Sequence, residues 1–169
     1  MWHRYRSAGI VRRLRFGAMS VQIAISRVRK LPPDLDQLVL ASLAEGFRLL
    51  ERFRDEWTSG ANCFALPGEA LFQARHQGRL IGICGLNRDP YAGQPSEGRV
   101  RRLYVAPDAR RLGVARRLVL DVVREARGQF AVLRLRTTTR EGALFYQALG
   151  FRPTTSMPTA THELRLPLG

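Results

Sequence analysis

The sequence predicts the α/β fold class, with a mixed β-sheet of about seven strands flanked by about four helices. Three observations lead to this prediction. Strand and helix patterns alternate in the order β-α-α-β-β-β-α-β-α-β-β. Residues 70–86 have the alternation and central turn of a β-hairpin. Residues 99–119 read as a strand, a tight turn and a helix.

The first predicted elements are one strand and two helices. Apolar and polar residues alternate over residues 21–28, which predicts a strand. Pro32-Pro33-Asp34 favours the start of a helix. A second helical pattern closes at residues 58–60. Its regularly spaced apolar residues are Phe47, Leu50, Phe53 and Trp57. We expect this stripe to pack mainly in the core.

Three strands follow, and the first two form the hairpin. They cover residues 70–77 and 80–86, with the turn at 76–79, and residues 87–98 form a loop that contains proline and glycine. The third strand ends at Ala106-Pro107-Asp108, because proline cannot donate to a strand ladder and disfavours helix in the residue before it.

The last third of the chain alternates again between helix and strand. Apolar residues recur at helical spacing from Val114 to Ala126, and Gly128 is suited to end that helix. A strand over residues 132–137 precedes a short helix over residues 143–150, and residues 162–166 form the last strand.

Composition narrows the class of protein. The chain has 169 residues, 45% of them hydrophobic, and contains no apolar run near the roughly 18 residues of a membrane span. Cys63 and Cys84 lack metal-ligand spacing, so we expect reduced thiols, no metal and a cytoplasmic location. The formal net charge of +14 admits a nucleic-acid partner, but the arginines are spread over nearly every element, which disfavours one.

Residues 1–19 differ from the rest in being free of acidic residues and rich in arginine. An organelle-type presequence, a tail for an anionic partner, and translated sequence ahead of a true start at Met19 all fit this composition. We expect a disordered basic extension followed by a domain over residues 20–169.

The turn before the third predicted helix is suited to bind an anion. The first N–H groups of a helix lack intrahelical partners and carry partial positive charge. Gly113 permits unusual backbone angles and close approach of a ligand, and Arg110, Arg111 and Arg116 add charge.

Two motifs here resemble those of the GNAT superfamily of N-acetyltransferases. Arg110-x-x-Gly113-x-Ala115, after the strand end Leu103-Tyr104-Val105, resembles the family's pyrophosphate loop. The segment Ala143–Phe151, with Phe145-Tyr146 and a closing Gly-Phe, resembles its second signature. The resemblance covers residues 21–167 and is strongest from 80 to 151.

The resemblance implies transfer of an acetyl group from acetyl-CoA, the implied co-substrate, to a primary amine by direct attack within a ternary complex. Pyrophosphate would lie on the amides of residues 111–116, and the pantetheine arm would pair with the strand edge at 103–105. The Val105 N–H would stabilise the oxyanion. The cofactor-binding residues implied are Leu103, Tyr104, Val105, Arg110, Arg111, Leu112, Gly113, Val114, Ala115 and Arg116.

The resemblance also implies a catalytic acid, Tyr146, which would protonate the leaving thiolate. The general base stays open. Many relatives carry a glutamate near the position of Arg101 or Arg102, which are arginines here. Glu97, Asp89, Glu45 and a water chain are the candidates.

The acceptor is not readable from the sequence. In the family, helices equivalent to the second one border the acceptor pocket, so Phe47, Phe53 and Trp57 are also candidates for its wall. A homodimer is common in such folds. Two other functions remain: a non-catalytic acyl-CoA sensor, and a basic module that binds nucleic acid or an acidic partner.

Overall fold

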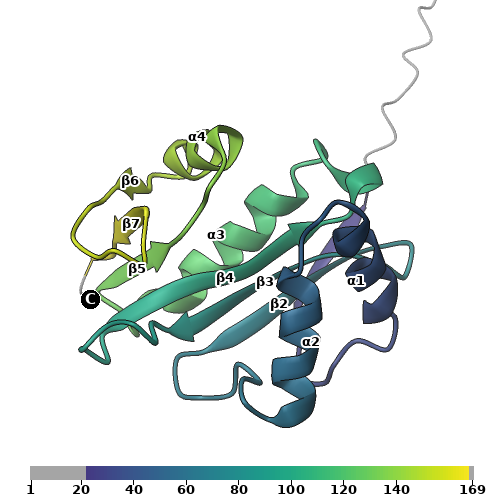
Figure 1. Ribbon diagram of the computed structural model, residues 1–169, viewed down its shortest axis with the longest axis horizontal. Helices are drawn as coiled ribbons and strands as arrows, with labels where there is room; N and C mark the ends of the chain where they lie inside the picture. Colours follow the sequence, from purple (N-terminus) through teal and green to yellow (C-terminus); the bar gives the residue numbers. More distant parts are fainter. Residues whose placement is uncertain (1–21, 168–169) are drawn as a thin grey trace, which may run out of the picture.

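The computed structural model describes residues 22–167 (Figure 1). The strands are β1 (Ile23–Arg27), β2 (Ala70–His76), β3 (Arg79–Arg88), β4 (Glu97–Val105), β5 (Val132–Leu135), β6 (Arg152–Pro153) and β7 (His162–Arg165). The helices are α1 (Leu35–Ala44), α2 (Leu49–Ser59), the 3-10 turn η1 (Pro107–Ala109), α3 (Val114–Ala126) and α4 (Arg140–Ala148).

The seven strands form one mixed sheet in the order β1-β2-β3-β4-β5-β7-β6. Only the β4–β5 pair is parallel; the others are antiparallel. The predicted element order and fold class are therefore confirmed within residues 22–167. The prediction for residues 1–19 falls outside the described residues.

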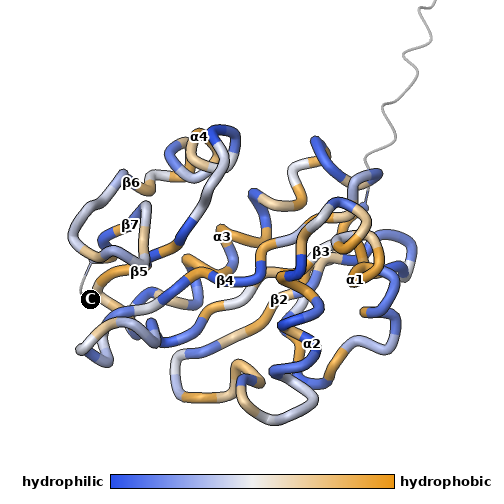
Figure 2. Tube along the Cα trace, in the orientation of Figure 1, coloured by the Kyte–Doolittle hydropathy of each residue, from blue (hydrophilic) through white to orange (hydrophobic). Residues whose placement is uncertain are grey.

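Helices cover both faces of the sheet (Figure 1). α1 and α2 lie on one face of the β1–β4 part, and α3 lies on the other. Hydrophobic and hydrophilic segments alternate along α3, as an amphipathic helix requires (Figure 2). The buried residues of α3 are Val114, Leu118, Val119, Val122, Val123 and Ala126. One layer of the core thus lies between α3 and the central strands, and a second lies under α1 and α2, whose Leu35, Leu38, Val39, Leu50 and Phe53 are buried.

The sheet divides between β4 and β5. These strands pair only where Glu97, Gly98 and Arg99 face Val132, Leu133 and Arg134. Beyond these three pairs, β4 continues to Val105 while β5 ends at Leu135, and the two diverge (Figure 1). The register of β4 against β3 also shifts within the stretch from 101 to 104, as at a β-bulge. Arg102, in this bulge, has a left-handed φ of 61°.

Several predicted boundaries were wrong by a few residues. The loop predicted over 87–98 is shorter, because β3 continues through Arg88, whose N–H donates to the Glu69 carboxylate. The second helix begins at Leu49, after Phe47 has donated its N–H to the Ser42 carbonyl. No helix within residues 22–167 is both long enough and apolar enough to cross a membrane.

Candidate active site

The turn between β4 and α3 leaves a helix N-terminus uncapped. Gly113 is the N-cap residue, with a left-handed φ of 74°, and no side chain of residues 22–167 caps the N–H groups that follow it. The first turn of α3 contains no acidic residue. Arg111 is also left-handed, at φ 63°, which is uncommon for a side-chain-bearing residue and typical of ligand-binding turns. The turn therefore offers free N–H donors and partial positive charge to an anion.

A cavity of about 360 Å³ opens at this turn. It lies between the N-terminus of α3 and the face of α4 that carries Phe145. A Cβ built at Gly113 would meet no atom of residues 22–167 within 4 Å, so these residues leave the space beside it open. The lining residues are Val105, Ala109, Arg110, Arg111, Gly113, Val114, Ala115, Arg116, Phe145, Ala148 and Leu149. Leu112, from the predicted cofactor set, is outside this lining and 45% exposed.

The Arg110 side chain is engaged within the protein. Its two terminal nitrogens donate to the two Glu45 oxygens at 2.7 Å each, and its Nε donates to the Val105 carbonyl at 3.1 Å. The Tyr104 hydroxyl also donates to Glu45, at 2.6 Å. Arg110 and Tyr104 together lower the pKa of the Glu45 carboxyl. Arg110 thus ties the turn to the end of α1, and Glu45 is held as an ion.

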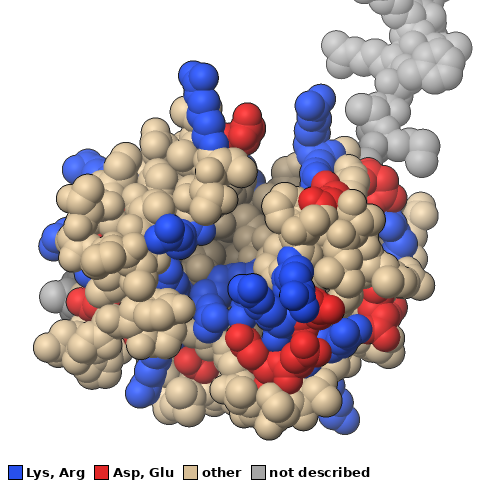
Figure 3. All heavy atoms as spheres, in the orientation of Figure 1, with Lys and Arg blue, Asp and Glu red and all other residues tan. Residues whose placement is uncertain are grey.

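A second depression, of about 650 Å³, runs along β4 where that strand diverges from β5. We call it the arginine groove; Figure 3 shows the hollow, with basic side chains gathered in it. Leu103, Tyr104 and Tyr146, three of the predicted site residues, line it. Its other lining residues are Phe47, Leu49, Arg52, Tyr91, Arg99, Val100, Arg101, Arg102, Arg136, Thr137, Thr138 and Thr139.

Tyr146 reaches this groove from α4. The helix begins where the Thr139 hydroxyl accepts the Gly142 N–H at 3.0 Å, a cap that the sequence reading missed. The ring of Tyr146 makes edge-on contacts with Phe145 and Phe151, with centroids 5.0 and 5.6 Å away. Burial raises the pKa of its hydroxyl, which therefore stays protonated across the physiological range.

The Val105 N–H is on the side of β4 that faces the divergence. The next residue, Ala106, donates its N–H to the Ile81 carbonyl on β3. Because successive N–H groups of a strand point to opposite edges, the Val105 N–H points away from β3, toward the gap before β5. This gap therefore has a free backbone donor beside Tyr104 and the cavity at α3.

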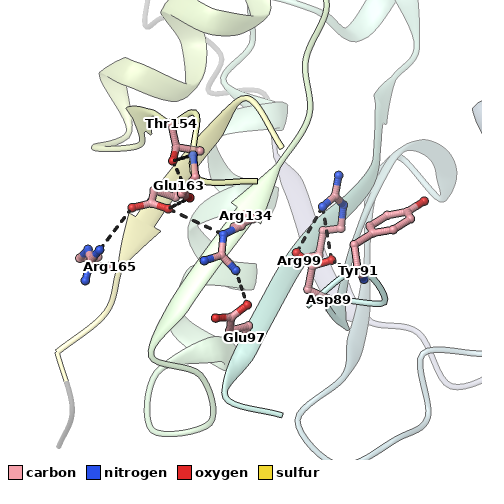
Figure 4. Close-up of polar contacts among 9 residues, drawn as sticks. Asp89, Tyr91, Glu97, Arg99, Arg134, Thr154, Glu163 and Arg165 are labelled. Atoms are coloured by element: carbon pink, nitrogen blue, oxygen red, sulfur yellow. Dashed lines mark hydrogen bonds and ion pairs between the residues drawn. The ribbon is translucent and has the colours of Figure 1, made fainter. Parts of the chain in front are cut away.

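The three candidate bases are all held in ion pairs, and none lines the groove. Asp89 is buried against Arg99, at 3.2 Å, and Glu97 contacts Arg134 (Figure 4). Glu45 is bound by Arg110. Within residues 22–167, no Asp or Glu is among the groove's lining residues.

The aromatic stripe of α2 contributes little to this site. Phe53 is fully buried and packs edge-on against Trp57, with ring centroids 5.9 Å apart. Of the three aromatic wall candidates, only Phe47 lines the groove. Within residues 22–167, no three His, Cys, Asp or Glu side chains are grouped as metal ligands would be.

Sequence reasoning missed most of the groove's charge. Arg52, Arg99 and Arg136 come from α2, β4 and the segment after β5. No motif links them, because they meet only through the topology of the sheet. The signal in the sequence was the pair Arg101 and Arg102, near a position where the resemblance implies a glutamate in many relatives.

Known acetyltransferases resemble this chain in sequence and in fold. The profile of the acetyltransferase (GNAT) domain matches residues 67–153. A provisionally assigned acetyltransferase from Exiguobacterium sp. 255-15 is 30% identical, with a TM-score of 0.76 over 85% of this chain and 93% of that one. No curated protein gives a match.

Two more distant structures have the same fold. The acetyltransferase yncA from Salmonella typhimurium, solved with acetyl-CoA and likewise provisionally assigned, is 14% identical, with a TM-score of 0.66 over 87% of this chain and 95% of that one. The GNAT family N-acetyltransferase YhbS from Escherichia coli, in complex with CoA, is 17% identical, with a TM-score of 0.65 over 98% of this chain and 86% of that one.

Proposed function

The chain belongs to the GNAT family of acetyltransferases, and from that premise we propose that it moves an acetyl group from acetyl-CoA to a primary amine by direct attack within a ternary complex. The observation that carries the proposal is the uncapped N-terminus of α3, beside an open cavity and the unpaired edge of β4. A cytoplasmic location is part of the proposal, supported by the free thiols Cys63 and Cys84.

Two features support the binding of acetyl-CoA. The free N–H groups of residues 111–116 suit a pyrophosphate, and Arg111 and Arg116 line the same cavity. Among the described strands, none pairs with the β4 edge at 103–105 on the β5 side, so this edge can pair with the amides of a pantetheine arm. Arg110 acts here as a brace through Glu45 rather than as a phosphate ligand.

Acetyl-CoA supplies, when bound, an acetyl group activated as a thioester. The Val105 N–H would donate to the carbonyl oxygen as that oxygen gains charge, a contribution of roughly 3 kcal/mol in other acyl-transfer sites. The Tyr146 hydroxyl would donate its proton to the departing sulfur. The attacking amine would lose its proton to water in the groove, since no groove-lining residue is a carboxylate.

Titration calorimetry with acetyl-CoA, followed by a primary-amine panel monitored by free-thiol release, tests the proposal. We expect saturable binding and amine-dependent thiol release. Absence of any binding heat, confirmed by a second binding method, would overturn the cofactor assignment. Binding without thiol release from any amine would favour the alternative of a non-catalytic acyl-CoA sensor.

A further inference from the structure

The arginine groove holds more positive charge than its surroundings neutralise. Five arginines line it: Arg52, Arg99, Arg101, Arg102 and Arg136. Two carboxylates contact them: Asp89 pairs with Arg99, and Glu56 pairs with Arg102 at 2.6 Å and with Arg101 at 3.9 Å. Within residues 22–167, neither Arg52 nor Arg136 forms an ion pair. The groove therefore has a surplus of three positive charges.

This surplus positive charge is least exposed to solvent at Arg101 and Arg102, which we call the floor of the groove. The Arg102 side chain is only 10% exposed, and its Nε is buried without a hydrogen-bond partner in the described part of the chain. Burial, and next the charge of Arg102, lower the pKa of the Arg101 guanidinium. Arg102 is also held in a left-handed conformation by the bulge of β4. Buried like charges and an unpartnered donor are costly unless a ligand compensates them.

We propose that the amine acceptor is a small molecule that also carries an anionic group, a carboxylate or a phosphate, which binds in the arginine groove. This inference rests on the proposed acetyl transfer and specifies its substrate class. The guanidinium groups of the floor would hold the anion with charge-assisted hydrogen bonds, and Arg52 and Arg136 would close over it from the two rims.

The arginine groove is separate from the cavity proposed for the cofactor. The cavity at α3 is lined by Arg110, Arg111 and Arg116, and none of these lines the groove. Tyr146 and Tyr104, beside the proposed point of transfer, line the groove together with the five arginines. An anion on the floor would thus place the rest of a short acceptor toward Tyr146. The burial of that floor favours a small acceptor over an extended chain.

Two pairs of amines that differ in charge test the inference. β-Alanine is compared with β-alaninamide, and phosphoethanolamine with ethanolamine. Binding to the CoA-saturated protein is measured by calorimetry, and kcat/KM with acetyl-CoA by thiol release. We expect the anionic member of at least one pair to bind at least tenfold more tightly and to react correspondingly faster. The pair with the larger difference identifies carboxylate or phosphate as the preferred group.

Variants at the rim locate the effect. Arg52 and Arg136 are exposed and outside the ion-pair network, so the double variant Arg52→Gln/Arg136→Gln is expected to fold. This double variant should reduce the preference for the anionic amine over its neutral partner to less than threefold. Arg29→Gln, at an exposed position just after β1, changes the net charge by one without touching the groove and should keep the preference.

The outcomes separate this inference from the proposed function. Equal use of charged and neutral amines, or no binding of any probe at millimolar concentration, would overturn the anionic acceptor. A tenfold loss of CoA affinity in the double variant would assign the arginines of the groove to the cofactor. A preference for an acidic peptide over every small probe would also contradict the inference. Anion-selective binding without thiol release from any amine would instead contradict acetyl transfer and leave the anion site intact.

Discussion

At the scale of single residues, the hydroxyl of Tyr146 is the group that links α4 to the proposed chemistry. Tyr146→Phe keeps the ring that packs on Phe145 and Phe151. We expect kcat to fall by about 10²-fold or more, since general acids contribute that much, while acetyl-CoA affinity changes by less than about threefold. Thiol release and calorimetry measure the two quantities. Tyr91→Phe, which deletes an exposed hydroxyl at the groove, is the control, and undiminished turnover in Tyr146→Phe would exclude the acid role.

Asp34 is the residue whose charge most clearly supports the fold. Its carboxylate accepts two hydrogen bonds from Arg75, at 2.7 and 3.0 Å, and one from the Leu80 N–H at 3.0 Å. It therefore joins the start of α1 to the β2–β3 hairpin. We expect Asp34→Asn to lower the free energy of unfolding by about 1–3 kcal/mol in urea denaturation. Asp36→Asn, whose side chain is 73% exposed, should cost less than about 0.5 kcal/mol.

The same residue predicts a dependence on pH. The hydrogen bonds from Arg75 lower the pKa of Asp34 below its ordinary value of 3.8. A depressed pKa in the folded state stabilises the protein above the unfolded pKa, and this stabilisation is lost as pH falls through the folded pKa. The difference in the free energy of unfolding between wild type and Asp34→Asn should be constant above about pH 5 and shrink below pH 3.8. A difference that grew on acidification would contradict the pairing.

At the scale of elements, the turn before α3 can be tested with two glycines of similar conformation. Gly113 and Gly78 have φ of 74° and 79°, and a Cβ at either would meet no atom within 4 Å. Alanine at either position should cost about 1–2 kcal/mol of stability, because left-handed backbone disfavours a Cβ. Only Gly113→Ala should weaken acetyl-CoA binding, by about tenfold or more, which calorimetry would detect. An equal loss of affinity in Gly78→Ala would show that the effect is not local to the turn.

Elements were predictable from the sequence to the extent that local patterns define them. The hairpin turn at Gln77-Gly78 and the apolar face of α3 are encoded in adjacent residues, and both were predicted. The boundaries at Arg88 and Glu97 were missed because backbone pairing with neighbouring strands sets them. Arg88 pairs with Gly98 of β4, and Glu97 pairs with Val132 of β5, 35 positions along the chain. The Arg88 N–H also donates to Glu69. The uncapped turn could be predicted, but the arginine groove could not, because its charges converge only in three dimensions.

At the scale of the whole molecule, the sheet consists of two parts with a narrow junction. Three residue pairs join β4 to β5. Arg134 of β5, which is buried, lies between Glu97 of β4 and Glu163 of β7 and reinforces that junction (Figure 4). Tyr146 belongs to the smaller part, while the Val105 N–H and the α3 turn belong to the larger one. The proposed site is therefore assembled across the division, and a ligand bound there would contact both parts.

Hydrogen exchange can test this view of the molecule. A ligand that contacts both parts opposes any opening that separates them, by about 2.7 kcal/mol at a concentration of 100 Kd, or roughly 100-fold in exchange rate. We expect saturating acetyl-CoA to slow amide exchange in α4, in residues 136–139 and in the first turn of α3. The β1–β2 edge lies outside the lining of the cavity and the groove, and its local openings should be little affected. Gly113→Ala at the same acetyl-CoA concentration serves as the control and should show a smaller effect. Slowing confined to α3, with α4 unchanged, would mean that the cofactor binds to the larger part alone, and the transfer site would then have to be built without Tyr146.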